Sequence, residues 1–274
     1  MSNELRVLMY HKVAGADEKV DELSVSLEQL KSHFNYLHGN GFNTISFSQL
    51  ISYIKEETAL PENPVLITFD DGYADNFRNM LPLATKMNIK TNIFIVPEFI
   101  GRNDREFMSV SQLKACDPSL VEFGLHSYDH ASYSNLSVEQ VRTDLQKCFD
   151  WSNHNEIAIQ PCLAYPYGSF PKENDEGKDR FLAALEASGI EAAFRIGNRL
   201  NSLPLSNKFI IQRLDIRRDQ TLTEFEMKLR FGRISPIRRL LRKFSKEPIR
   251  TINDSYKKLS LIVKQSVLSA QAHI

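Results

Sequence analysis

Short polar segments of the 274-residue chain carry side chains that could bind a metal ion or move a proton. In the segment HSYDH, His126 and His130 stand four residues apart, so both imidazoles could reach one metal ion if the segment turns through a helical loop. A third ligand is needed, and Asp70 and Asp71 offer carboxylates elsewhere in the chain. Two histidines and one carboxylate leave coordination positions open for water, which is typical of catalytic rather than structural metal sites.

Each of these segments has a simpler interpretation when taken alone. The DDG sequence at 70–72 is typical of a solvent-exposed turn, and the two histidines could lie in a loop without binding anything. One observation favours a single site built from all these segments: each polar segment directly follows a short apolar run. His11 follows the run 5–10, Asp70 follows 65–69, His126 follows 121–125 and Pro166 follows 162–165.

These apolar runs are the strands that we expect to position the site. Rich in Val, Ile and Phe, they alternate with helix-like stretches and comprise 5–10, 65–69, 92–96, 121–125, 162–165, 192–196 and 209–214. Continuously apolar strands separated by helices are typical of parallel sheets buried on both faces. Seven or eight of them predict a (β/α) barrel, an α/β fold in which all carboxyl ends of the strands open on the face that holds the active site.

Two of the expected helices have readable first residues. Ser26 with Gln29, and Ser137 with Gln140, match the capping-box pattern in which a Ser and a later Gln satisfy backbone N–H groups at the helix start. Apolar residues at helical spacing follow both starts.

Composition indicates an ordinary soluble globular protein, with 42% hydrophobic and 25% charged residues. No apolar run approaches the roughly 18–20 residues of a membrane span. The three cysteines form no CxxC pair, so neither a disulfide framework nor a structural zinc site is indicated. The first residues resemble no cleavable leader. We therefore expect a cytoplasmic protein.

Positive charge is concentrated near the C-terminus, although the formal net charge is zero. From Lys228 to Lys264 there are 12 Lys and Arg against two acidic residues. We expect a barrel over residues 1–230 and a basic amphipathic helical tail over 231–274. The tail could pack on the barrel or on a second copy of the chain, or it could contact the inner face of an anionic membrane. The sequence leaves these alternatives and the oligomeric state open.

The ordered motifs resemble those of polysaccharide deacetylases, the NodB-like carbohydrate esterase family 4. TFDDG at 68–72, HSYDH at 126–130 and YPYG at 165–168 are similar to the first three motifs of this family and follow its order, over roughly residues 5–215. MYHKV at 9–13 is similar to the branch that includes poly-N-acetylglucosamine deacetylases, in which an early histidine replaces a late one. The resemblance implies a distorted NodB-like (β/α)7–8 barrel that hydrolyses an N-acetyl group of an amino sugar.

Carried over position by position, the resemblance implies that Asp71, His126 and His130 bind a divalent metal and that Asp70 is the general base. Zn²⁺ is the expected ion, with Co²⁺ or Ni²⁺ as alternatives. A bound cation would polarise the amide oxygen, lower the pKa of a water molecule and let Asp70 stay ionised beside Asp71. The backbone N–H of Tyr167 is the expected donor to the oxyanion.

Two departures from the family pattern affect the remaining roles. The late Leu-x-His motif is absent, which leaves His11 as the expected acid, because its unperturbed pKa lies near neutrality; a structural histidine at a strand end is the alternative. The family's Arg two residues before Pro166 is Ala164 here. Arg213, at the end of a later strand, could replace it by orienting the base, or could form a surface ion pair.

The residues expected to contact substrate are Tyr73, Pro166, Tyr167 and Arg213. Because the first residues resemble no leader, we expect a biosynthetic intermediate that is lipid-linked or nucleotide-linked. The other histidines of the body, His33, His38 and His154, are expected at the surface.

The sequence thus predicts a metal-dependent N-deacetylase acting on an amino sugar in a carbohydrate or glycan intermediate. Two alternatives stay open: a related hydrolase of another C–N bond, in a formamide or ureide, and a carbohydrate-binding homologue without catalysis. A nucleic-acid partner is not expected, because the chain has no Gly-rich phosphate loop and its basic residues do not alternate with aromatic ones.

Overall fold

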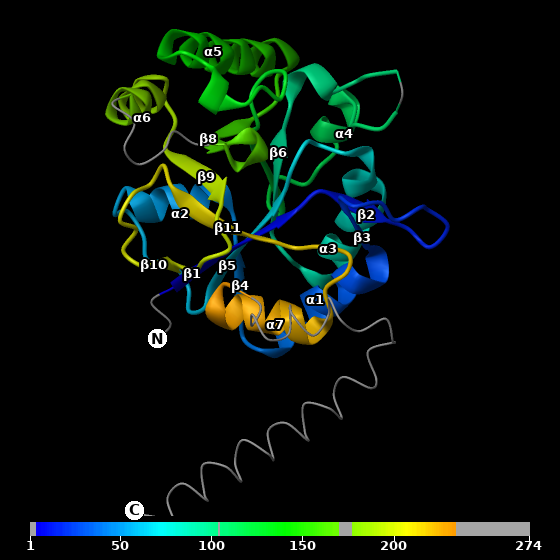
Figure 1. Ribbon diagram of the computed structural model, residues 1–274. Coiled ribbons are helices and arrows are strands. Elements are labelled where there is room, and N and C mark those ends of the chain that lie inside the picture. Colours follow the sequence, from blue (N-terminus) through cyan, green and yellow to red (C-terminus); the bar gives the residue numbers. More distant parts are fainter. Residues whose placement is uncertain (1–3, 104, 170–176, 234–274) are drawn as a thin grey trace, which may run out of the picture. The chain divides into compact units, whose positions relative to one another are not determined.

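The computed structural model describes residues 4–103, 105–169 and 177–233 (Figure 1). Its centre is a closed ring of parallel strands in the order β1-β11-β9-β8-β7-β6-β5, with β5 pairing back to β1. The strands are β1 (Glu4–Tyr10), β5 (Pro64–Phe69), β6 (Thr91–Ile95), β7 (Val121–Leu125), β8 (Ile159–Ala164), β9 (Ala192–Ile196) and β11 (Ile211–Asp215). The ring confirms the expected barrel, with seven strands that match the seven apolar runs.

Four short strands were not expected. The strand β4 (Asn43–Ile45) pairs with the first half of β5, while β6 pairs with the second half. The strand β10 (Asn201–Ser202) runs antiparallel to the start of β1, and β2 (Lys12–Ala14) pairs with β3 (Ser24–Ser26) in a separate ribbon. Strands of two or three residues are too short to show a hydrophobic period, so the sequence pattern could not reveal them.

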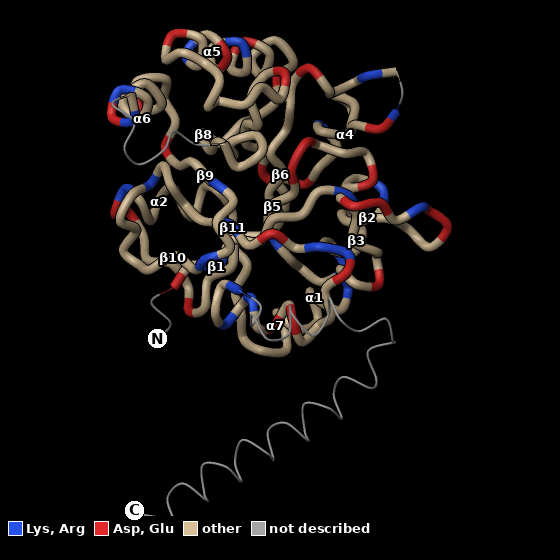
Figure 2. The backbone as a smooth tube through the Cα atoms, viewed as in Figure 1, with Lys and Arg blue, Asp and Glu red and all other residues tan. Residues whose placement is uncertain are grey.

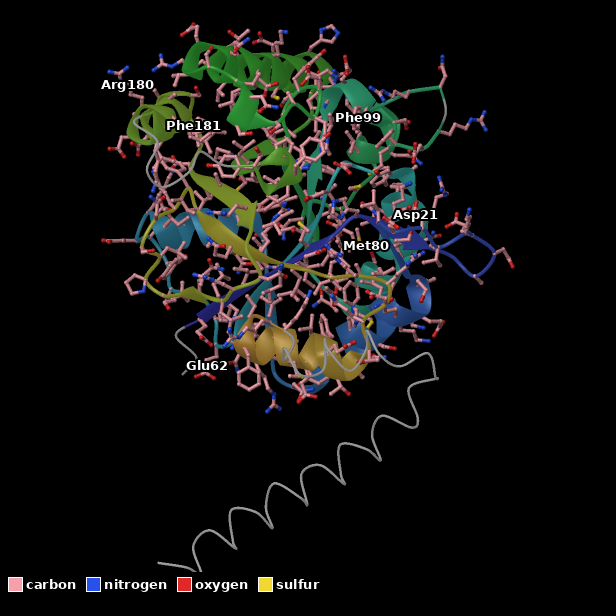
Figure 3. The ribbon with its side chains drawn as sticks, viewed as in Figure 1. Asp21, Glu62, Met80, Phe99, Arg180 and Phe181 are labelled. Carbon is pink, nitrogen blue, oxygen red and sulfur yellow. The ribbon has the colours of Figure 1, made fainter. Side chains whose placement is uncertain are left out.

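Side chains fill the interior of the ring, so the barrel is a packed core (Figure 3). Alternate strand residues face inward: Leu5 and Val7 of β1 share one apolar cluster with Leu66 of β5, Phe194 of β9 and Ile211 of β11. Residues of α2 (Phe47–Ile54) join this cluster. The same alternation continues toward the carboxyl ends of β5 and β11, where the inward residues Thr68, Asp70 and Arg213 are polar.

Helices cover the outer face of the barrel, packing on the residues that alternate with the inward ones. They are α1 (Leu27–Gly39), α3 (Leu81–Met87), α4 (Val110–Lys114), α5 (Val138–Asn155), α6 (Lys178–Ala187) and α7 (Leu222–Phe231). Both expected helix starts are found. Ser26 caps α1 by accepting from the backbone N–H of Gln29, and Ser137 and Gln140 form a reciprocal capping box on α5.

One expectation about the histidines is wrong. His38 and His154 are exposed as expected, but His33 is buried. Its Nδ1 lies 3.0 Å from the hydroxyl of Tyr10, and its ring stacks on Phe225 of α7 with the centroids 3.9 Å apart. The pattern within α1 could not reveal that a helix almost 190 residues later covers this position.

The outer surface carries both charges. Figure 2 shows Lys and Arg interspersed with Asp and Glu over the described helices and loops. Beyond α7, which ends at a left-handed Gly232, the expected basic tail lies outside the described residues from position 234 onward and stays a prediction. Within the described ranges, no helix has both the length and the apolar character needed to span a membrane.

Candidate metal centre

The two adjacent aspartates come from the carboxyl end of β5. Thr68 and Asp70 continue the inward-facing register of Leu66, so the Asp70 side chain enters the top of the barrel. In an extended strand Asp71 would face the opposite way, but its backbone turns into the left-handed region, with φ at 74°. Gly72 follows at φ 76°, where an added Cβ would lie 3.3 Å from the side chain of Ile95. This turn places both carboxyl groups in the same cavity.

The two histidines come from the carboxyl end of β7. His126 directly follows the strand, and its backbone N–H donates to the carbonyl of Ile95 on β6. The chain then turns back through Ser127 and His130, both at positive φ, of 63° and 65°. The segment is therefore an irregular turn with two left-handed residues, and not the helical loop that the four-residue spacing suggested. It nevertheless brings both imidazoles to one point.

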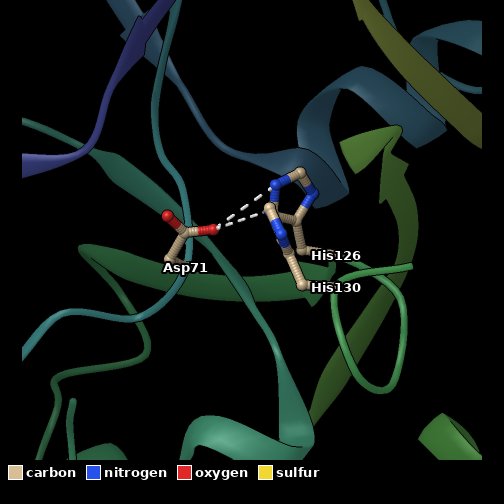
Figure 4. A group of neighbouring side chains, drawn as sticks. All are labelled: Asp71, His126 and His130. Carbon is tan, nitrogen blue, oxygen red and sulfur yellow. Dashed lines mark ion pairs between the residues drawn. The ribbon is translucent and has the colours of Figure 1, made fainter. Parts of the chain in front are cut away.

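Asp71, His126 and His130 converge on a common centre (Figure 4). Asp71 Oδ1 lies 3.5 Å from Nε2 of His126 and 3.3 Å from Nε2 of His130. Metal–ligand distances of about 2.0–2.2 Å at angles of 90–110° place ligand atoms about 3.0–3.5 Å apart, so these spacings suit one cation. Asp71 Oδ1 is also buried without a hydrogen-bond partner among the described residues. An unpartnered carboxylate oxygen facing two imidazole nitrogens fits a bound divalent ion.

The hydrogen bonds of the two imidazoles leave the inner nitrogens available as ligands. Nδ1 of His126 lies 2.7 Å from the carbonyl oxygen of Ala164, which requires this nitrogen to carry the proton. Nδ1 of His130 lies 3.0 Å from the hydroxyl of Tyr167. In both rings Nε2 therefore faces Asp71. Burial lowers the pKa of His126 to about 3, so its ring is neutral and ready to bind a metal at physiological pH.

We expect metal binding to displace a proton from Asp71 below about pH 6. Burial, together with the neighbouring charge of Asp70, raises the pKa of Asp71 in the metal-free protein to about 6, although His11 opposes the shift. A cation requires the ionised carboxylate, so the apparent affinity should fall about tenfold per pH unit below that value. Titration calorimetry in buffers of different ionisation enthalpy should show more protons released per Zn²⁺ at pH 5.0 than at pH 7.5. Equal release at both values would contradict this assignment.

Asp70 is held by Arg213 of β11, a strand that only β1 separates from β5 in the ring. The two terminal guanidinium nitrogens lie 2.6 and 2.8 Å from the two carboxylate oxygens, and both side chains are almost wholly buried. Burial alone would raise the pKa of Asp70, but the charge of Arg213, aided by His126 and His11, lowers it to about 2. Asp70 is therefore ionised at neutral pH. Of the two arrangements expected for Arg213, the structure shows the pairing with Asp70; a surface ion pair is excluded.

His11 also reaches this cluster from the end of β1. Its Nε2 lies 3.9 Å from Asp70 Oδ2, and its side chain is one-fifth exposed. The backbone carbonyl of His11 accepts a hydrogen bond from the Asn76 side chain at 2.9 Å, which ties β1 to the turn after the two aspartates. The position suits a proton donor at the cavity wall, and the role itself stays a prediction.

The expected substrate contacts divide into two groups. Tyr167 is 70% exposed and lines the cavity, and Arg213 lines it from beneath Asp70. Tyr73 and Pro166 are buried and are not among the lining residues. The hydroxyl of Tyr73 hydrogen-bonds the carboxyl of Asp71, and its ring stacks on Phe107. Tyr73 therefore supports the carboxyl of Asp71 instead of facing the cavity mouth.

A cavity of about 350 Å³ opens above the cluster. Part of its wall comes from residues that the sequence did not single out: Glu22, Leu23, Ile196, Asp215, Ile216 and Arg217. They lie just before β3, at the end of β9, and at the end of β11 and in the loop that follows. No motif marks them, because a cavity wall requires only surface side chains at the right strand ends.

Comparison with known proteins gives a consistent result. A family model described as polysaccharide deacetylase matches residues 57–193. YxkH of Bacillus subtilis (strain 168), whose name places it among polysaccharide deacetylases, is 28% identical over 191 residues, which cover 69% of this chain and 63% of YxkH. The poly-beta-1,6-N-acetyl-D-glucosamine N-deacetylase of Staphylococcus epidermidis is 24% identical over 241 residues, 79% of this chain and 80% of that protein.

Among solved structures, the deacetylase PplD of Streptococcus pyogenes superposes with a TM-score of 0.71. The match covers 82% of this chain and 98% of PplD at 14% sequence identity. An identity this low supports the fold alone, and the fold agrees with the closed ring described above.

Proposed function

Because the chain belongs to the polysaccharide deacetylase family, whose members hydrolyse a carbon–nitrogen bond other than a peptide bond, we propose that it removes N-acetyl groups from amino sugars of a glycan. The observation that best supports this is the unpartnered Asp71 Oδ1 facing two imidazole nitrogens, beside a second carboxylate whose oxygens are both held by Arg213. The relative from S. epidermidis suggests N-acetylglucosamine units as the substrate.

The polar side chains of the cluster beneath the cavity each have a place in this reaction. A divalent cation held by Asp71, His126 and His130 would polarise the acetyl carbonyl and lower the pKa of the attacking water. Asp70 accepts a proton from that water as the water oxygen bonds to the carbonyl carbon. His11 then donates a proton to the sugar nitrogen as the C–N bond breaks, which releases acetate and the amino sugar.

The fixed charges of the cavity favour this division of roles. Asp70 stays ionised through the neutral range because Arg213 compensates its charge, so it is available as a base. The side chain of His11 is less buried than that of Asp70, so it lies closer to solvent. The backbone N–H of Tyr167 is the proposed donor to the oxyanion, because Tyr167 lies at the cavity wall after β8.

The proposal predicts that catalysis depends on the metal. Purified protein treated with a chelator and then freed of it should lose acetate release from β-1,6-linked N-acetylglucosamine oligomers, down to the background rate. One equivalent of Zn²⁺, Co²⁺ or Ni²⁺ should restore it, because three ligands meet at a single centre. Acetate and free amine are measured together, with chelator saturated by calcium as the control. Full activity in the metal-free protein would contradict the proposal.

A substrate panel tests the bond and the linkage. We propose a glycan intermediate, lipid-linked or nucleotide-linked, handled in the cytoplasm. Acetyl, formyl and ureide compounds are compared at equal concentration, and the acetyl sugars are offered free, nucleotide-linked, lipid-linked and polymeric. Turnover of formyl or ureide compounds alone would reassign the reaction, and glycan binding without any turnover would indicate a binding protein.

A further inference from the structure

The turn between the two histidine ligands adopts an unfavourable backbone conformation. Ser127 and His130 both have positive φ values, of 63° and 65°, and neither is glycine. Side chains with a Cβ rarely adopt this region, and such conformations persist at functional sites only where the surroundings hold them firmly. Some group outside the turn must therefore hold it.

The backbone N–H of Glu98 donates to the carbonyl of Tyr128 at 3.0 Å. The side chain that holds the turn from outside is the carboxylate of Asp144, on α5. Its Oδ1 accepts a hydrogen bond from the backbone N–H of Tyr128 at 3.0 Å and lies 3.4 Å from Oγ of Ser127. Its Oδ2 accepts from the hydroxyl of Tyr133, in the short helical turn that follows. Ser127 Oγ in turn accepts from the backbone N–H of Ala131 at 2.9 Å. One carboxylate thus contacts the turn between the two ligands and the segment after it.

The surroundings of Asp144 make this arrangement unusual for a residue with only a packing role. The side chain is buried, and its neighbours on the same face of α5, Val141, Leu145 and Cys148, belong to an apolar cluster. A carboxylate in such a place loses solvation, which is offset only by the hydrogen bonds that it accepts. All of those described come from residues 127–133.

We propose that Asp144 is a positioning residue of the metal site, which pre-organises the turn so that His130 Nε2 already lies beside Asp71 Oδ1 before a cation binds. The inference rests on the proposed function only in taking Asp71, His126 and His130 as metal ligands. Without Asp144, part of the free energy of metal binding would be used to order the turn. Loss of a group that hydrogen-bonds behind a metal ligand typically weakens metal affinity about 10–100-fold.

The test measures Zn²⁺ affinity by competition with a chromophoric chelator in the full-length metal-free protein. Asp144→Ala should raise the dissociation constant at least about tenfold. Asp144→Asn should stay within about threefold of wild type, because the amide oxygen still accepts from Tyr128 N–H and the amide NH₂ can donate to Tyr133. The Co²⁺ absorption spectrum of Asp144→Ala should also change, since a mobile His130 alters the ligand field.

Two controls separate positioning from stability and from charge. Asp150→Asn removes a carboxylate from an exposed position of the same helix and should leave Zn²⁺ affinity unchanged. Leu185→Ala removes a buried side chain from the same apolar cluster, so it lowers thermal stability without touching the turn. The proposal is overturned if Asp144→Ala loses stability yet binds Zn²⁺ as tightly as wild type. Metal binding is read without substrate, so this failure is distinct from a failure of the deacetylase assignment.

Discussion

Asp70→Asn should lower kcat/KM for acetate release about 10³-fold while the protein still binds one equivalent of metal. The amide cannot accept the proton of the attacking water, and removal of a general base typically costs about 10²–10⁴ in rate. The metal should be retained because Asp70 is not one of the three converging ligands; its nearer oxygen lies 3.8 Å from His126 Nε2. Acetate release and Zn²⁺ stoichiometry are measured on the same preparation.

The neighbouring aspartate provides the matched comparison. Asp71→Asn should lose both metal and activity, because Asp71 Oδ1 faces both imidazole nitrogens. Asp117→Asn, at an exposed turn before β7, controls for the loss of one negative charge. An Asp70→Asn protein that keeps wild-type activity would refute the base assignment, and one that loses its metal would move Asp70 into the ligand set.

The gathering of polar residues at one end of the barrel was predictable, because all strands of a parallel barrel have their carboxyl ends on the same face. Once the runs ending at Tyr10, Phe69 and Leu125 are assigned to parallel strands, His11, Asp70 and His126 must emerge on the same face. That inference needs no knowledge of which strands are neighbours. The family resemblance read from the ordered motifs is likewise confirmed by the family model.

What the sequence could not show is contact between segments that carry no periodic signal. Asp144 lies on α5, fourteen positions beyond His130. The apolar stripe of this helix predicts burial of the neighbouring apolar residues, but it gives no sign that a carboxylate among them is buried. His33 is buried because Phe225 of α7 stacks on its ring and the Tyr10 hydroxyl of β1 lies against its Nδ1. The conformation of the turn after His126 depends on positive φ values at Ser127 and His130. A positive φ can be predicted from sequence at a glycine, but not at a serine or a histidine.

We expect the Asp70–Arg213 pair to contribute to both catalysis and stability, so Arg213→Met should impair both. Removing one partner of a buried pair leaves an uncompensated charge, which typically costs about 3–5 kcal/mol of unfolding free energy. With Arg213 absent, burial should raise the pKa of Asp70 from about 2. The base would then be protonated over the acid range, so kcat/KM should decline at a higher pH than in wild type as the pH falls.

A pH series of acetate release and a set of unfolding curves check these effects together. In wild type, the low pKa of Asp70 means that its contribution to stability is present above its unfolded value near 4 and is lost only as the pH falls toward 2. In Arg213→Met that contribution is absent. The double variant Asp70→Asn/Arg213→Met should be more stable than Arg213→Met alone, because no buried charge remains to be compensated. Arg213→Met could instead unfold like wild type, with kcat/KM declining at the same acidic pH as in wild type. Arg213 would then not govern the ionisation of Asp70, and another group must keep that carboxylate charged.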